Sequence, residues 1–299
     1  MTSNARGVWL SLITVVCWSV LPITLRIASR HVDPFTLTWY RFLVSAILLG
    51  ALLAARRALP PLARVRVRGN AGLFVLATAG LVSNYVLYLV SLSYVSPTIG
   101  TVITQLGPLL LMLGGVLLFH ERLSRRQTIG VVLLIFGLFV FFNRRLVELM
   151  DMSGRAGIGA IILLVASVTW ATYGLGQKVL LGRFTSPQIL FLIYVGASLL
   201  LAPFVAPTSV KGLPAIELVM LGLSCLNTLV AYGALAEALH HAGATTVGAV
   251  LAVGPVASLI VTWASNHASP GFFAPDLLNV ATVAGAVVVA VGSALSASK

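Results

Sequence analysis

The segment YVLYLVSLSYVSPTIGTVITQLGPLLLMLGGVLLFHERLS, residues 85–124, is the most informative stretch of the chain. It completes one apolar run, passes a short break at Pro97, and enters a second run that stops at Glu121 and Arg122. The second run, residues 98–119, carries no charged residue and matches the ~20 apolar residues that a helix needs to cross a membrane. The segment therefore indicates consecutive transmembrane helices.

The composition of the whole chain agrees with this reading. Of its 299 residues, 59% are apolar and 9% are charged, and the mean hydropathy is +1.04. Soluble domains average ~45–50% apolar and ~25% charged residues, so both a soluble fold and intrinsic disorder are excluded. Cys17 and Cys225 both lie in apolar runs, so no disulfide framework or thiolate zinc site is expected.

The apolar runs set the expected fold class, an all-α integral membrane protein with ten transmembrane helices. We expect the first run to be a retained helix rather than a signal peptide, because nine more runs follow it. The ten runs cover about residues 8–29, 35–55, 71–92, 98–119, 127–143, 157–178, 187–206, 215–238, 245–265 and 277–297.

The net charge of +12 is distributed in the gaps between the runs. Basic residues placed there are topology anchors and do not form a nucleic-acid-binding stripe. With a cytoplasmic N-terminus, the inner gaps hold twelve Lys and Arg residues and the outer gaps hold five. The sequence thus predicts that both termini are cytoplasmic, although Arg144, Arg145 and Arg155 in the middle loop oppose this bias.

The two halves of the chain repeat each other. Val16-Cys17-Trp18 matches Val168-Thr169-Trp170 at a shift of 152 residues, and a longer block matches at a shift of 147. Because five spans is an odd number, the second half must enter the membrane inverted. We therefore predict two inverted five-helix repeats, residues 1–146 and 147–299, an architecture typical of secondary transporters with a central site. The matched block pairs Tyr85, Leu92, Thr98, Gly107 and Pro108 with Tyr232, Leu239, Thr245, Gly254 and Pro255.

Three segments resemble the EamA repeats of the drug/metabolite transporter superfamily: WSVLPITLRIA (18–28), WYRFLVSAILLG (39–50) and the 85–124 block. The second half departs from the pattern, since it lacks counterparts of Arg41 and Glu121. Among members, the chain is most similar to YddG-type amino-acid exporters of the bacterial inner membrane. The resemblance implies ten helices around a central cavity and export of aromatic and other amino acids.

Polar and aromatic side chains at helical spacing are the candidates to line that cavity. Isolated Thr, Ser and Asn side chains in lipid more often join helices, but amides have more groups to satisfy than a hydroxyl. We expect the amides to bind the ammonium and carboxylate of a substrate and the aromatic rings to bind its side chain. The candidate substrate-binding residues are Trp18, Arg41, Asn84, Tyr85, Tyr88, Thr101, Gln105, Trp170, Asn227 and Tyr232.

Arg41 and two prolines have alternative interpretations. Arg41 lies ~12 Å inside its run, where it either meets a substrate carboxylate or has a structural role. Pro108 and Pro255 each follow a glycine at matched positions, and they are either hinges for alternating access or static kinks. Four glycines indicate close helix packing, within the chain or between subunits, and we expect a monomer; they are Gly130, Gly137, Gly285 and Gly292.

These features predict an exporter of amino acids, with a broad range, that works by alternating access. No phosphate-binding loop and no deep Asp or Glu is present, so we expect downhill transport without ATP hydrolysis or tight proton coupling. The alternatives are export of lipophilic drugs or other small metabolites, with nucleotide sugars less favoured, and an intramembrane hydrolase. The expected partners are small amphipathic metabolites and the lipid bilayer, and no catalytic residue, metal or cofactor is predicted.

Overall fold

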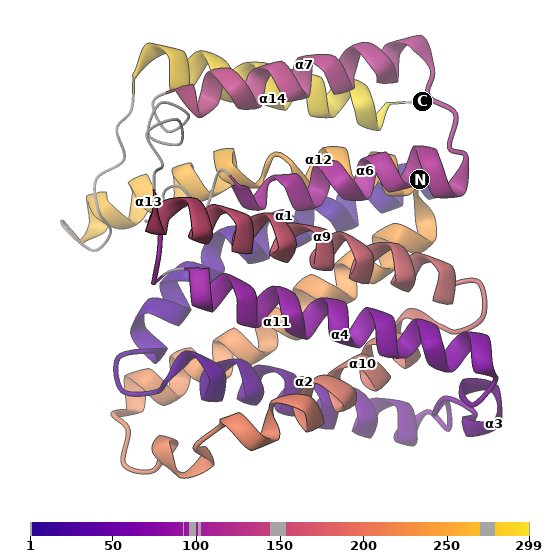
Figure 1. The fold of residues 1–299 in the computed structure, drawn as a ribbon, viewed down its shortest axis with the longest axis vertical. Helices are drawn as coiled ribbons and strands as arrows, with labels where there is room; N and C mark the ends of the chain where they lie inside the picture. The colour runs from indigo at the N-terminus through magenta and orange to yellow at the C-terminus, as the bar shows by residue number, and fades with distance from the viewer. Residues whose placement is uncertain are drawn as a thin grey trace.

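The computed structural model describes residues 2–91, 93–95, 100, 103–143, 154–269 and 279–298, and in these ranges it contains helices and no strand (Figure 1). The first half contains α1 (Ser3–Ala28), α2 (Pro34–Ala55), α3 (Leu62–Val65), α4 (Arg68–Ser91), α6 (Leu106–Phe119) and α7 (Arg125–Phe141). The second half contains α9 (Arg155–Leu180), α10 (Ser186–Leu201), the 3₁₀ turns η1 (Ala202–Phe204) and η2 (Pro207–Val210), α11 (Ala215–His241), α12 (Ala244–Leu251), α13 (Gly254–Ala268) and α14 (Val280–Ala297).

Capping side chains fix where several helices begin. Asp33 accepts a hydrogen bond of 2.9 Å from the backbone N–H of Thr36, and Pro34 follows it at the first helical position of α2. Asn279 caps α14 in the same way, through the N–H of Thr282 at 2.7 Å. Each cap satisfies a donor that the first helical turn leaves unpaired, so the helices start at the polar gaps between the apolar runs.

Eight helical segments are long and apolar enough to cross a membrane. They are α1, α2, α4, α9, α10 with η1, α11, α12 with α13, and α14. Large apolar side chains such as Val75, Leu118 and Leu199 are exposed on the outer faces, as expected for contact with lipid. The remaining two predicted spans correspond to α6, with 14 residues, and α7, with 17 residues. Eight spans therefore meet the length criterion, and the count of ten remains a prediction.

The helix pairs follow a pseudo-two-fold pattern. α1 packs on α11 and α4 packs on α9, while α2 packs on α10, α6 on α12 and α7 on α14. Each helix of the first half has a counterpart in the second half: α1 with α9, α2 with α10, α4 with α11, α6 with α12 and α7 with α14. When every helix is exchanged with its counterpart, the same five pairs result. The packing of the bundle thus has the symmetry that a duplicated sequence predicts.

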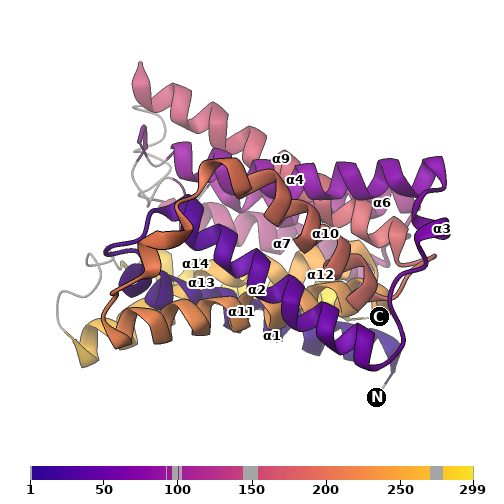
Figure 2. The same cartoon turned by 90° about the horizontal axis from the view of Figure 1, so that it is seen from below.

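The two halves also run in opposite directions. Asn4 in the first turn of α1 donates to the backbone oxygen of Ala297 at 3.0 Å, so both termini lie at one end of the bundle. Figures 1 and 2 show that the short helix α3 lies at this same end, which we call the terminal end. α1 starts there, whereas Lys178, in the last turn of α9, contacts the α11–α12 connection at that end. The opposite end is called the far end.

The helix breaks differ from the sequence-based expectation. The predicted span 245–265 is two helices, because α12 ends at Leu251 and α13 begins at Gly254. Pro255 and Pro108 both lie in first turns, of α13 and α6, so the expected kinks within continuous helices are wrong at these two prolines. Proline lacks the N–H and clashes with the preceding turn, and it is tolerated best where a helix starts. Pro22, in contrast, lies within the continuous helix α1, inside the predicted span 8–29.

The predicted close packing at the four glycines is confirmed, and it joins α7 to α14 within the chain. A Cβ atom added to Gly137 would lie 2.7 Å from the backbone nitrogen of Val289. An added Cβ at Gly130, Gly285 or Gly292 would likewise collide with backbone of the facing helix. Only glycine permits the two backbones to approach this closely.

Candidate functional site: a cavity between the two halves

A cavity of about 350 Å³ lies between the two halves of the bundle. Its walls come from α1, α4, α6, α9, α11, α12 and α13, and it extends from the middle of the bundle toward the far end. Pro108 and Pro255 both line it, at the two helix breaks. Seven of the predicted binding residues also line it, namely Trp18, Asn84, Tyr85, Tyr88, Gln105, Trp170 and Tyr232.

Aromatic rings form the floor of the cavity on its terminal side. The ring centroid of Trp18 lies 5.8 Å from that of Trp170 and 5.6 Å from that of Tyr232, with both pairs edge-on. Tyr173 packs beneath, with its centroid 5.8 Å from that of Tyr232, and it is fully buried. Such edge-to-face pairs are favourable, so the floor is an aromatic layer drawn from both halves.

Two amides of the cavity wall have different environments. The side-chain nitrogen of Asn84 donates to the backbone oxygen of Ala166 at 2.9 Å, which joins α4 to α9. The side-chain oxygen of Gln105 is buried and has no hydrogen-bond partner among the residues that the structure describes. An unpaired buried acceptor is costly, and a ligand that donates an N–H to it would remove that cost.

A buried arginine supports the tyrosines of the wall. Arg41 is only 3% exposed, and its Nε donates to the hydroxyl of Thr228 at 2.8 Å. Its Nη2 donates to the hydroxyl of Tyr85 at 3.3 Å, and that hydroxyl lies 3.1 Å from the hydroxyl of Tyr232. Arg41 does not line the cavity itself. Its guanidinium is instead held by side chains, so Arg41 acts on the cavity through Tyr85.

Besides Arg41, two further predicted binding residues are not placed at the cavity. Asn227 donates to the backbone oxygen of Cys17 at 2.7 Å and lies at the contact between α1 and α11. Thr101 falls outside the described residues. Conversely, Thr104 and Ser258 line the cavity and were not predicted. Ser258 follows Pro255 at the i+3 position, so extending the helical spacing by one turn would have found it.

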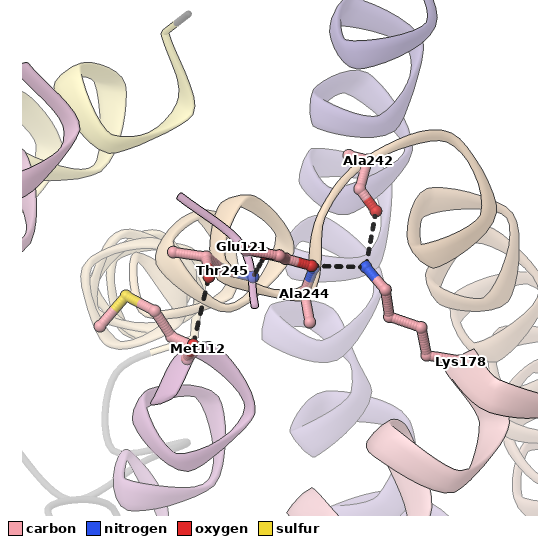
Figure 3. Close-up of polar contacts among 6 residues, drawn as sticks. All are labelled: Met112, Glu121, Lys178, Ala242, Ala244 and Thr245. Atoms are coloured by element: carbon pink, nitrogen blue, oxygen red, sulfur yellow. Dashed lines mark hydrogen bonds and ion pairs between the residues drawn. The ribbon is translucent and has the colours of Figure 1, made fainter. Parts of the chain in front are cut away.

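A hydrogen-bond network around Glu121 joins the two halves at the terminal end (Figure 3). Glu121 follows α6, and its Oε1 accepts hydrogen bonds from Lys178 Nζ at 2.8 Å and from the N–H of Ala244 at 2.7 Å. Its Oε2 accepts from the N–H of Thr245 at 2.9 Å, while Lys178 also donates to the backbone oxygen of Ala242 at 3.3 Å. We call Glu121, Lys178 and the first turn of α12 the Glu121 clamp, because they tie the first half to the second.

The clamp changes the acidity of its carboxyl group. Burial alone would raise the pKa of Glu121, but hydrogen bonds from Lys178 and Thr245 and the charge of Lys178 outweigh it and hold the pKa below its usual range. The start of α12 adds a favourable site for a negative charge. Sequence analysis identified Glu121 only as the end of a repeat motif, since no local spacing connects it to Lys178.

Comparisons with known proteins indicate a transporter. The profile of the EamA-like transporter family matches residues 5–143 and 157–296. A protein of Escherichia coli K12 named "Uncharacterized inner membrane transporter YhbE" is 40% identical over 291 residues, which cover 97% of this chain and 91% of the relative. An "Uncharacterized transporter" of Haemophilus influenzae is 34% identical over 291 residues, or 97% of this chain and 94% of the relative.

More distant proteins extend the comparison. A "Probable amino-acid metabolite efflux pump" of Escherichia coli K12 is 23% identical over 247 residues, which cover 77% of each chain. A solved crystal structure matches with a TM-score of 0.76 at 19% identity, covering 98% of this chain and 97% of the other. At that identity the structural match shows a shared fold.

Proposed function

The chain belongs to the EamA-like transporter family, and from this premise we propose that it exports amino acids, aromatic ones included, across a bacterial inner membrane. The observation that supports this most is the cavity of about 350 Å³ with aromatic and amide walls drawn from both halves. The names of the relatives, an inner membrane transporter and probable amino-acid metabolite efflux pumps, point the same way.

The size and lining of the cavity favour a small solute. Small-molecule pockets span ~300–1,000 Å³, so this cavity is at the small end and suits a single amino acid. No Lys or Arg is among the described residues that line it. A nucleotide sugar would need such side chains to bind its diphosphate, and it is therefore disfavoured.

Each part of the substrate has a candidate partner. The unpaired oxygen of Gln105 would accept a hydrogen bond from the ammonium group, and the hydroxyls of Tyr85 and Tyr232 would donate to the carboxylate. The rings of Trp18 and Trp170 would contact the side chain. Because the polar contacts serve groups that all amino acids share, we propose a broad range of substrates.

Alternating access is the proposed mechanism. In the proposed resting state the aromatic floor and the Glu121 clamp close the terminal end, and the excess of Lys and Arg favours the cytoplasm as the side that this end faces. In this scheme the two five-helix repeats, residues 1–146 and 147–299, move relative to each other. This motion converts the state closed at the terminal end into one that is open to the cytoplasm. The breaks before Pro108 and Pro255 are the proposed hinges, since broken helices at mid-membrane depth line the sites of many transporters.

Flux measurements in proteoliposomes test this proposal. Vesicles loaded with phenylalanine should release it faster than protein-free vesicles, and they should do so without a pH gradient, because no acidic residue is among the described residues of the lining. Threonine should also be released. Flux of a lipophilic drug with no flux of any amino acid would overturn the proposal and favour the drug-exporter alternative.

A further inference from the structure

We propose that this cavity selects its solutes by charge, accepting carboxylates, alone or within a zwitterion, and rejecting organic cations. The inference rests on the proposed transport function and deepens it, since it concerns the chemical class of the substrate. It depends on one buried charge, Arg41, and on the direction of the hydrogen bonds that lead from Arg41 to the cavity wall.

The first step is the distribution of charge around the cavity. The chain has seven acidic residues, of which Glu148, Asp151 and Asp276 lie outside the described ranges. The other four are at helix ends or in connections: Asp33 precedes α2, Glu217 is in the first turn of α11, Glu121 follows α6, and Glu237 is near the end of α11.

Arg41, in contrast, lies within α2 and is almost fully buried. The ion pairs found among the described residues join His31 to Glu217, Lys178 to Glu121 and His241 to Glu237, and none of them involves Arg41. A buried charge without a counter-charge is unfavourable, and burial weakens the screening of its field. The cavity beside it therefore has a positive potential, which favours an anionic group in a ligand.

The second step is the direction of the hydrogen bonds. Arg41 has only N–H donors, so the oxygen of Tyr85 accepts from it, and the proton of Tyr85 is free to point onward. That proton can be donated to Tyr232 or to a ligand, and each donation strengthens the next donor in the chain. The wall made by Tyr85 and Tyr232 thus presents hydrogen-bond donors. A carboxylate can accept from these hydroxyl protons, whereas an ammonium group, which only donates, can reach only the lone pairs of phenolic oxygens that already take part in the network led by Arg41.

The third step concerns the ammonium group of a zwitterion. The unpaired oxygen of Gln105, on the α6 side of the cavity, is an acceptor that a carboxylate cannot use. A zwitterion can bind both the tyrosine wall and the oxygen of Gln105. A carboxylate without an ammonium group binds only the tyrosine wall. An amine without a carboxylate binds only Gln105, and its positive charge is repelled by Arg41. The expected order of affinity is zwitterion, then carboxylate, then amine.

Three solutes that share a phenyl ring separate these cases: phenylalanine, 3-phenylpropionate and 2-phenylethylamine. Each competes with labelled phenylalanine for transport by the full-length protein in proteoliposomes at neutral pH. We expect the amine to compete roughly tenfold more weakly than the carboxylate, as the loss of a charge-assisted hydrogen bond predicts. Tyr85→Phe should weaken competition by 3-phenylpropionate and leave competition by 2-phenylethylamine unchanged, so the difference between these two competitors should become smaller.

Variants of Arg41 distinguish its charge from its packing. Arg41→Gln should reduce the difference in competition strength between 3-phenylpropionate and 2-phenylethylamine. Arg41→Lys keeps the positive charge, so it should retain that difference. Tyr40→Phe is the matched control, because Tyr40 is adjacent in α2 but its hydroxyl donates to Pro207 rather than to the Arg41 network. The ranking of probes is the readout, since a loss of folding alone reduces all fluxes together.

The outcomes separate this inference from the proposed function. Phenylalanine flux with equal competition by the amine and the carboxylate overturns charge selection and leaves amino-acid transport standing. An unchanged ranking in a folded Tyr85→Phe protein overturns the role of the tyrosine wall. Absence of any phenylalanine flux in the parent protein overturns the proposed function, and charge selection with it.

Discussion

At the scale of single residues, the cavity divides into an aromatic part and a polar part. Trp170 is 8% exposed and packs against Trp18 on one side, while a Cβ atom added at Gly107 would lie 3.0 Å from its ring. The side chain thus forms the cavity floor and also fills the space beside the break before Pro108. Gln105, by contrast, offers the cavity a side-chain oxygen that no described residue pairs with.

Trp170→Ala should weaken transport of phenylalanine and tryptophan more than transport of threonine. Aromatic pairs contribute ~0.5–1.5 kcal/mol beyond the area they bury, so a loss of several-fold is expected for the aromatic substrates. The measurement is the ratio of phenylalanine to threonine flux in proteoliposomes. Gln105→Leu provides the contrast, because it should weaken all substrates alike. Equal loss of every substrate in a normally folded Trp170→Ala protein would show that Trp170 is not a substrate wall.

Sequence patterns located these residues unevenly. Helical spacing identified Trp18, Gln105 and Trp170, because a face that lines a cavity repeats at each turn. It could not place the amide of Asn227, whose bond to Cys17 depends on how α1 and α11 are positioned along each other. Contacts between distant segments have no local signature, so they emerge only from the packed structure.

At the scale of helices, the pair α7 and α14 is held together by small residues and lies outside the cavity lining. Gly292→Ala should reduce thermal stability in detergent, since the new Cβ would collide with the backbone nitrogen of Leu134. Overpacking of this kind costs ~1–3 kcal/mol. Gly222→Ala in α11 is the control, because an added Cβ there meets nothing within 4 Å. A Gly292→Ala protein as stable as the control would contradict this account of the α7–α14 contact.

The helices themselves were predicted well from apolar runs, and the breaks were not. The caps Asp33 and Asn279 sit in polar gaps that the sequence shows directly. Residues 247–257, in contrast, carry no polar side chain, so hydropathy gave no sign that α12 stops at Leu251. The signal was the Gly254-Pro255 pair, for which the sequence left two interpretations open, a hinge or a static kink. In lipid, such a break is tolerated where packed helices or a cavity satisfy the backbone.

At the scale of the whole molecule, the inverted relation of the halves predicts the membrane topology. α3 lies at the terminal end, and α13 starts in mid-bundle and runs to the far end (Figure 1). Reporter fusions after Ala63 and after Asn266 should therefore report opposite sides of the membrane, with Ala63 on the cytoplasmic side. A cytoplasmic signal at both positions would refute the ten-helix inverted arrangement.

The Glu121 clamp predicts how the terminal end opens. Glu121→Gln removes the charge that Lys178 and the start of α12 share, so the closed state should lose stability relative to the open one. Arg126 and Gly182 are exposed positions near this end, one in each half of the chain. Spin labels at these two positions would report opening of the terminal end as a longer label-to-label distance in pulsed electron paramagnetic resonance. Glu237→Gln is the matched control, since that acid pairs with His241 within α11.

Acidification should have the same effect as Glu121→Gln in the parent protein. The pKa of Glu121 is lowered in the closed state, so its contribution to closure is complete at neutral pH and is lost as the pH falls through that lowered pKa. His240 and His241 line the pocket that contains Glu121 at the terminal end, and both are present in parent and variant alike, so the variant is also the control for them. In the parent, the distance between the two labels should therefore increase as the pH is lowered. In Glu121→Gln the distance should already be long at neutral pH and should not increase further on acidification. If the parent and Glu121→Gln have the same label distance at neutral pH, the carboxylate of Glu121 does not hold the terminal end closed.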